Sequence, residues 1–288
     1  MFGSVVLEVA IGLGFVYLIL SLICSTVQEL IARIFALRSN MLYQGIENLL
    51  KDPNLKDTAK KVYEHPLVKN LAREGMQPSY IPARNFTVAL LDVLKDPNAT
   101  GGALSEAHKT VRKLPPGPLR ESLSALIEDS GGKIEDVRKS IEGWFDDAMD
   151  RVSGWYKRKA QNIVLVVAFA LAIGLNVDSV KVAGVLWENP TVRAEIVALA
   201  EQQTSQSFTD LQMTRMSELS NQLNALPIGW PVNLEASPYE KPFAVVVIIV
   251  GWIVTAFAVS LGAPFWFDAL GKLINLRSTG QAPKKTVS

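Results

Sequence analysis

Residues that could bind a metal ion or act as a nucleophile are few in this sequence. The chain has two histidines, His65 and His108, and one cysteine, Cys24, which lies in an apolar run. Zinc sites gather three or four His, Cys or carboxylate ligands, so these three residues do not predict the usual zinc site. A single cysteine also excludes an intramolecular disulfide.

Motifs of catalysis and nucleotide binding are also lacking in the sequence. Residues 129–133, DSGGK, resemble part of a phosphate-binding loop, but the first glycine of that motif is missing and no Ser or Thr follows Lys133. A helix start explains this stretch better. Because neither G-x-S-x-G nor H-E-x-x-H occurs, we predict a protein that is not an enzyme, with no catalytic residue, no cofactor and no metal.

Three polar residues next to apolar runs could line a path for a proton or a cation, namely Glu8, Asn176 and Asp178. Glu8 is more simply explained by a position at the membrane surface, since a helix needs only a few residues to reach it. Asp178 and Lys181 are three residues apart on one expected helix, which predicts that they pair with each other.

The elements that must carry these residues are three long runs without charge. They are 20 residues between Glu8 and Glu29, 18 between Lys159 and Asp178, and 26 between Lys241 and Asp268. A helix needs roughly 20 apolar residues to cross about 30 Å of hydrocarbon, so all three runs are long enough to span a membrane. The alternatives are a cleaved signal peptide for the first run and a buried core helix for the second.

Between these runs the sequence favours helices throughout, and the predicted fold is an all-α polytopic membrane protein. Apolar residues such as Leu119, Leu123 and Leu126 recur three or four positions apart, and the mixed charge argues against nucleic-acid binding. Residues 133–187 are expected to form one long helix, and Met216 to Leu226 an amphipathic one. The predicted segments are 1–38 (transmembrane helix 1 with a cytoplasmic extension), 39–160 (cytoplasmic helical domain), 161–187 (transmembrane helix 2), 188–241 (extracytoplasmic helical segment), 242–263 (transmembrane helix 3) and 264–288 (interfacial amphipathic helix and cytoplasmic tail).

Basic residues near the spans predict the orientation, because Lys and Arg concentrate on the cytoplasmic side. We expect the N-terminus outside and the C-terminus in the cytoplasm. The predicted outer side holds three basic residues near the spans, Lys181, Arg193 and Lys241. The predicted cytoplasmic side holds ten, namely Arg33, Arg38, Arg151, Lys157, Arg158, Lys159, Lys272, Arg277, Lys284 and Lys285.

Aromatic and small residues give the expected contacts of the spans. Trp155 and Tyr156, and Phe265, Trp266 and Leu270 after Pro264, are predicted to contact the membrane interface, with residues 265–276 lying along it. The alternative is a third span that continues straight into the cytosol. Small residues four apart allow helices to pack closely, and we expect such packing at Ala168, Ala172, Gly174, Ala258 and Gly262.

Three stretches, PSYIPARNFTVALLD, LNVDSVKVAGVLWENPTVRAEIV and APFWFDALGKLINLR, give the chain a resemblance to a widespread set of hypothetical bacterial membrane proteins. The resemblance implies an inner-membrane location and brings no activity with it. The leading hypothesis is therefore a non-enzymatic membrane scaffold or anchor that contacts lipid and packs with a second copy or another membrane protein. A channel or transporter subunit is the alternative, and an enzyme comes third.

Overall fold

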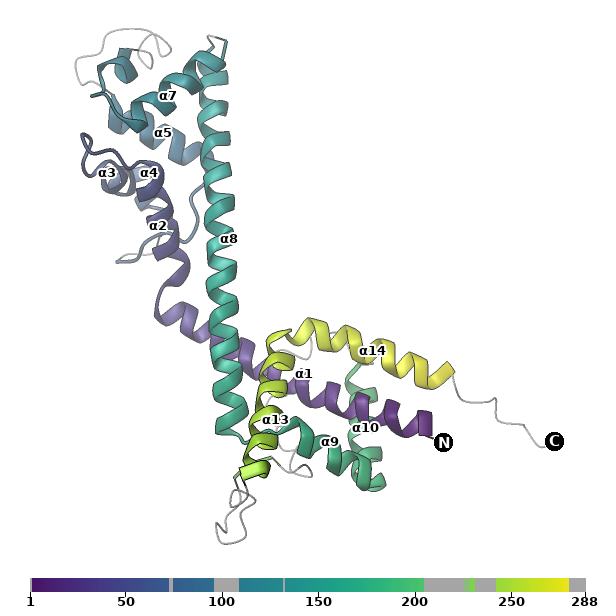
Figure 1. Cartoon of the computed structure of the whole chain (residues 1–288). Helices are drawn as coiled ribbons and strands as arrows, with labels where there is room; N and C mark the ends of the chain where they lie inside the picture. Colours follow the sequence, from purple (N-terminus) through teal and green to yellow (C-terminus); the bar gives the residue numbers. More distant parts are fainter. Residues whose placement is uncertain are drawn as a thin grey trace, which may run out of the picture. The chain divides into compact units, whose positions relative to one another are not determined.

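The computed structural model describes residues 2–72, 75–95, 109–131, 133–204, 226, 228–230 and 242–279. Helices are the only regular secondary structure in these ranges, which confirms the predicted all-α class (Figure 1). The chain divides into two compact units. Unit 1 contains residues 1–31 and 160–288, and unit 2 contains residues 32–159. Each unit is described by itself.

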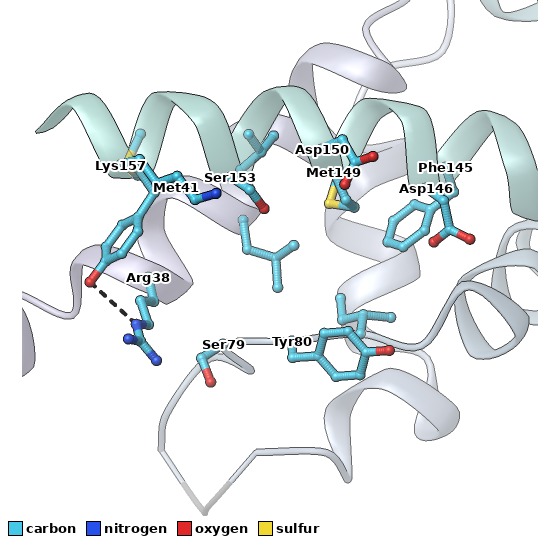
Figure 2. Close-up of a pocket in the computed structure, with 14 residues that line it drawn as sticks. Arg38, Met41, Ser79, Tyr80, Phe145, Asp146, Met149, Asp150, Ser153 and Lys157 are labelled. Atoms are coloured by element: carbon cyan, nitrogen blue, oxygen red, sulfur yellow. Dashed lines mark hydrogen bonds between the residues drawn. The ribbon is translucent and has the colours of Figure 1, made fainter. Parts of the chain in front are cut away.

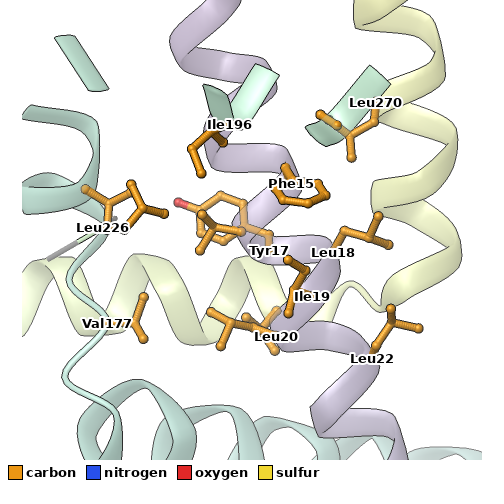
Figure 3. Close-up of a cluster of buried hydrophobic side chains, with 14 of the residues drawn as sticks. Phe15, Tyr17, Leu18, Ile19, Leu20, Leu22, Val177, Ile196, Leu226 and Leu270 are labelled. Carbon is orange, nitrogen blue, oxygen red and sulfur yellow. The ribbon is translucent and has the colours of Figure 1, made fainter. Parts of the chain in front are cut away.

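Unit 1 is built around the apolar part of α1 (Phe2–Ile34). Nearly every side chain from Ile11 to Leu22 is buried, among them Phe15 and Leu18 (Figure 3). A helix that is apolar on all sides is stable only when other elements cover it. The covering elements are the end of α8 (Ile134–Gly174), α9 (Ser179–Glu188), α10 (Pro190–Thr204), α13 (Pro242–Ser260) and α14 (Ala263–Thr279).

Membrane-span candidates in the described residues number between one and three. Val5–Ile34 is long and apolar enough by itself, whereas α8 with α9 and α13 with α14 qualify only as bent pairs, with bends of 55° and 96°. At least one helix can therefore cross a membrane, and the predicted count of three requires each bent pair to be one span.

The predicted continuous helix from residue 133 to 187 is wrong, because α8 ends at Gly174 and α9 starts at Ser179. Asn176 adopts a left-handed backbone conformation with φ of 47°. Asp178 then caps α9 through its own carboxylate, which accepts hydrogen bonds from the backbone N–H groups of Val180 and Lys181. The expected pairing of Asp178 with Lys181 therefore involves the backbone of Lys181.

A sharp turn separates α13 from α14, as the sequence around Pro264 predicts. Gly262 has a φ of 90°, which favours glycine, and Pro264 lies in the first turn of α14, where a missing N–H is tolerated. The 96° bend excludes the alternative of a straight continuation of α13 (Figure 1).

Unit 2 has its own core, formed by short helices against the first part of α8. These helices are α2 (Leu37–Leu49), α3 (Thr58–Glu64), α4 (Pro66–Lys69), α5 (Ala83–Leu94) and α7 (Pro118–Asp129). The rings of Phe86 and Phe145 stack with centroids 4.2 Å apart. Leu119 and Leu123 are buried and Leu126 is half-buried, as their spacing predicts.

Two predicted features fall largely outside the described residues. Of the amphipathic pattern at residues 216–226 only Leu226 is described, and it is buried in the core of unit 1. His108, Lys241 and the tail from residue 280 onward also lie outside.

Candidate functional site

The break between α8 and α9 brings together two of the polar residues proposed for an ion path. Asn176 donates a hydrogen bond from Nδ2 to the carbonyl oxygen of Gly229, at 3.0 Å. Its Oδ1 accepts one from the indole Nε1 of Trp252, at 3.1 Å. The Asn176 amide thus fixes the chain at a point where regular helical hydrogen bonds stop.

Asp178 is buried, with 4% of its surface exposed, and its carboxylate lies directly against Gly251 of α13. A Cβ atom at Gly251 would lie 1.7 Å from Asp178 Oδ1, so no other residue fits there without movement. Gly251 was not among the residues singled out in the sequence. A lone glycine in an apolar run gives no sign that a carboxylate 73 positions away approaches it.

A chain of hydroxyl groups links α1, α9 and α13 beside this break. The Tyr17 hydroxyl donates to Ser179 Oγ at 2.7 Å, and Ser179 Oγ lies 2.7 Å from Thr255 Oγ1. Thr255 Oγ1 also lies 2.7 Å from the carbonyl oxygen of Val177. Hydrogen bonds between helices in apolar surroundings stabilise helix packing by about 0.6–1.7 kcal/mol each. These hydroxyl groups therefore stabilise the packing of the three helices.

Glu8 belongs to a separate cluster of ion pairs. Arg193 Nε lies 3.0 Å from Glu8 Oε2, and Arg277 Nη2 lies 3.2 Å from Glu8 Oε1. Arg277 also pairs with Glu201. Arg193 is 8% exposed and donates further hydrogen bonds to the carbonyl oxygens of Leu186 and Trp187. The cluster therefore ties α1, α9, α10 and α14 together.

This cluster conflicts with one part of the predicted orientation. The predicted topology places Glu8 at the outer surface and Arg277 at the cytoplasmic surface, but two side chains in contact lie on the same side of a bilayer. The end of α14 therefore lies beside the first turns of α1, so Glu8 and Arg277 do not lie at opposite surfaces. The predicted side of the other segments stays a prediction.

The three residues of the alternative ion path do not meet. Tyr17, which contacts the break at Ser179, lies nine positions after Glu8 in α1, and nine helical steps rise roughly 14 Å. Asn176 and Asp178 hold the helix break, whereas Glu8 holds the ion-pair cluster.

The predicted membrane contacts have different environments in the two units. Phe265 and Trp155 are exposed, and Tyr156 accepts a hydrogen bond from Arg38. Trp266 is half-buried, and its indole donates to the carbonyl oxygen of Ala258 at 2.6 Å. The predicted contact of Leu270 with the membrane interface must be corrected. This side chain is 0% exposed and packs against Gly14 of α1.

The small residues predicted to pack also separate into groups. Ala168 and Ala172 are buried within the core of unit 1 itself, so they are not available to a second chain. Gly174 is exposed, Ala258 is half-buried, and Gly262 forms the bend before α14.

Unit 2 contains a cavity of about 520 Å³ between α2, α8 and residues 79–81. Figure 2 shows side chains from all three segments directed toward it. No group of three or more potential metal ligands occurs among the described residues.

Comparison with known proteins gives no family for this chain. No protein-family model matches it, and neither a curated protein nor a solved structure is similar to it.

Proposed function

We propose that this protein is a non-enzymatic membrane scaffold in which unit 1 is embedded in the bilayer and unit 2 is held at one membrane surface. In this proposal, unit 1 associates with a second copy or with another membrane protein. The observation that carries the proposal is an exposed apolar stripe on α13.

The stripe consists of side chains on one face of α13 and at its end, Val246, Ile249, Val250, Ile253, Val254, Phe257 and Leu261. The polar and small residues of the same helix, Gly251, Thr255 and Ala256, are buried on the other face. A helix with its polar groups inside and its apolar side chains outside is suited to lipid or to an apolar partner.

The polar contacts inside unit 1 also support a scaffold. Buried hydrogen bonds from Tyr17, Ser21 and Ser179 and the ion pairs of Glu8 join helices that are far apart in sequence. These polar groups have partners within the chain, and in the proposed function they serve packing.

Cysteine cross-linking in membranes tests the proposed association. In a Cys24→Ser background, Ile253→Cys places a thiol on the exposed stripe, and Val259→Cys places one on the buried face of the same helix. An oxidant should join two Ile253→Cys chains, or join one chain to a fixed membrane partner, and should leave Val259→Cys unlinked. No cross-linking at Ile253 or at any other stripe position would overturn the proposed association.

A further inference from the structure

The cavity of unit 2 has the size of a small-molecule site. Its volume of about 520 Å³ lies within the range of roughly 300–1,000 Å³ that such sites occupy. Arg38, Met41 and Leu42 of α2 line one wall, and residues 145–157 of α8 line another. Ser79, Tyr80 and Ile81 complete it (Figure 2).

One end of the cavity is basic. Figure 2 shows Arg38 and Lys157 at the same end. Arg38 Nε donates to the Tyr156 hydroxyl at 3.2 Å, and the Arg38 Cζ atom lies 5.4 Å from the centre of the Tyr156 ring. The ring and the hydroxyl of Tyr156 therefore both contact the guanidinium at the cavity end, where Arg38 and Lys157 are exposed.

The middle of the cavity is apolar. Leu42, Ile81 and Phe145 form its floor and belong to the core of unit 2, while Met41 and Met149 are half-buried. Methionine side chains adapt to irregular apolar ligands because they are unbranched and flexible. Tyr80, with 72% of its surface exposed, offers a further ring beside this floor.

The opposite end is acidic, with Asp146 at the far end and Asp150 nearer the middle. These carboxylates repel a second anion, so a ligand with one negative group binds in a single direction. The cavity thus matches a molecule with an anionic head and an apolar tail.

The basic end is also the part of the cavity closest in sequence to the apolar unit. Arg38 follows the end of α1 at Ile34 by four residues, and Lys157 precedes the apolar run that starts at Ile163 by six. Both residues therefore lie in the short stretches of chain that connect unit 2 to the apolar segments. Basic pockets near the ends of spans bind the phosphates of anionic lipids.

We propose that this cavity binds one anionic phospholipid from the bilayer. Its phosphate contacts Arg38 and Lys157, and one acyl chain lies along Met41, Met149 and the apolar floor. The inference rests on the proposed membrane location of unit 1, and it adds a specific lipid ligand to unit 2.

Native mass spectrometry of the full chain released from lipid nanodiscs tests this proposal. We expect one phosphatidylglycerol molecule to remain bound from mixed phosphatidylcholine and phosphatidylglycerol discs, and no lipid to remain bound from phosphatidylcholine discs. Arg38→Gln with Lys157→Gln should lower retention at least about tenfold, the scale of losing hydrogen bonds between charged groups. Ser153→Trp, which fills the cavity from an exposed position, should lower it similarly.

The matched control is Arg158→Gln with Lys159→Gln, which removes the same charge from neighbouring residues that do not line the cavity. Equal loss of lipid in this control, or equal retention of both lipids by the wild type, would overturn the site. Retention of a peptide instead of a lipid would also overturn it.

Alkaline carbonate extraction of the same variants separates the two proposals. If the chain stays in the membrane but retains no phosphatidylglycerol, only the lipid site fails. If the chain is extracted into the soluble fraction, the membrane scaffold itself fails.

Discussion

Glu8 and Arg277 are 269 positions apart in the sequence, and their side chains meet at 3.2 Å. The contact closes α14 onto the start of α1, and Arg193 binds the other oxygen of the same carboxylate. Unit 1 is therefore held at this end by a carboxylate between two guanidinium groups. Side-chain exposure of 18% for Glu8 and 10% for Arg193 means that water screens the Glu8–Arg193 pair only in part.

Glu8→Gln should destabilise the protein, because it leaves two guanidinium groups together without the negative charge between them. We expect a loss of roughly 1.5–3 kcal/mol in the free energy of unfolding, measured by thermal denaturation in detergent. Glu195→Gln, at an exposed position of α10, is the control and should have little effect. Equal melting temperatures for Glu8→Gln and the wild type would show that the cluster is dispensable.

Gly251→Ala adds only one methyl group but should clearly lower the melting temperature. The new methyl group would lie 1.7 Å from Asp178 Oδ1. The carboxylate that caps α9 would have to move. Gly184→Ala is the matched control, because no atom lies within 4 Å of a Cβ there and alanine favours a helix. Thermal melts should therefore show a lower melting temperature for Gly251→Ala and an unchanged or higher one for Gly184→Ala. The reverse order would contradict the close approach of Asp178.

The hydroxyl chain predicts coupling between Tyr17 and Thr255 through Ser179. Ser179→Ala should cost about 0.6–1.7 kcal/mol, the range for hydrogen bonds between helices in apolar surroundings. Adding Tyr17→Phe to Ser179→Ala should cost less than Tyr17→Phe does alone, because the acceptor is already absent. Strict additivity in this double-mutant cycle would argue against the hydrogen bond.

Sidedness can be measured with single cysteines in a Cys24→Ser background. If α1 spans the bilayer, Ser122→Cys in unit 2 should react with an impermeant thiol reagent from one side. Glu195→Cys and Asn275→Cys should both react from the opposite side, since the ion-pair cluster places α10 and α14 together. Labelling of Asn275→Cys from the same side as Ser122→Cys would contradict the contact between Glu8 and Arg277.

Tyr63 predicts a pH effect in unit 2. Burial, and to a lesser degree Tyr43, raises the pKa of the Tyr63 phenol above its usual value of about 10. The contribution of the Tyr63 phenol to the free energy of unfolding is present below pH about 10. It decreases at higher pH, because the unfolded chain then loses the phenol proton more readily than the folded chain does. Tyr63→Phe should reduce that loss in alkaline melts.

Tyr63→Phe should also be tolerated at neutral pH, because the Tyr63 hydroxyl is buried and has no hydrogen-bond partner among the described residues. Tyr43→Phe, at a half-buried position, serves as the control. Identical alkaline melts for Tyr63→Phe and the wild type would exclude Tyr63 as the source of the pH effect.

Local patterns were enough to predict the helical class, the buried positions Leu119 and Leu123, and the turn at Pro264. They failed where the outcome depends on distant partners. Leu270 has the spacing of a lipid-facing residue, but Gly14 leaves room for it against α1. The hydroxyl groups of Tyr17 and Ser179, 162 positions apart, are ordinary in isolation, and only the fold brings them together. The break at Asn176 was missed because no proline marks it between residue 133 and Pro190.

The central proposal, a membrane scaffold that associates through unit 1, is tested most directly by the mass of the full chain in lipid nanodiscs. Native mass spectrometry should find a complex of two or more copies, or one copy with a membrane partner in fixed ratio. Ile253→Glu, on the exposed stripe of α13, should shift that complex toward single chains. A wild-type protein that stays strictly monomeric at every concentration, with no partner bound, would contradict the scaffold.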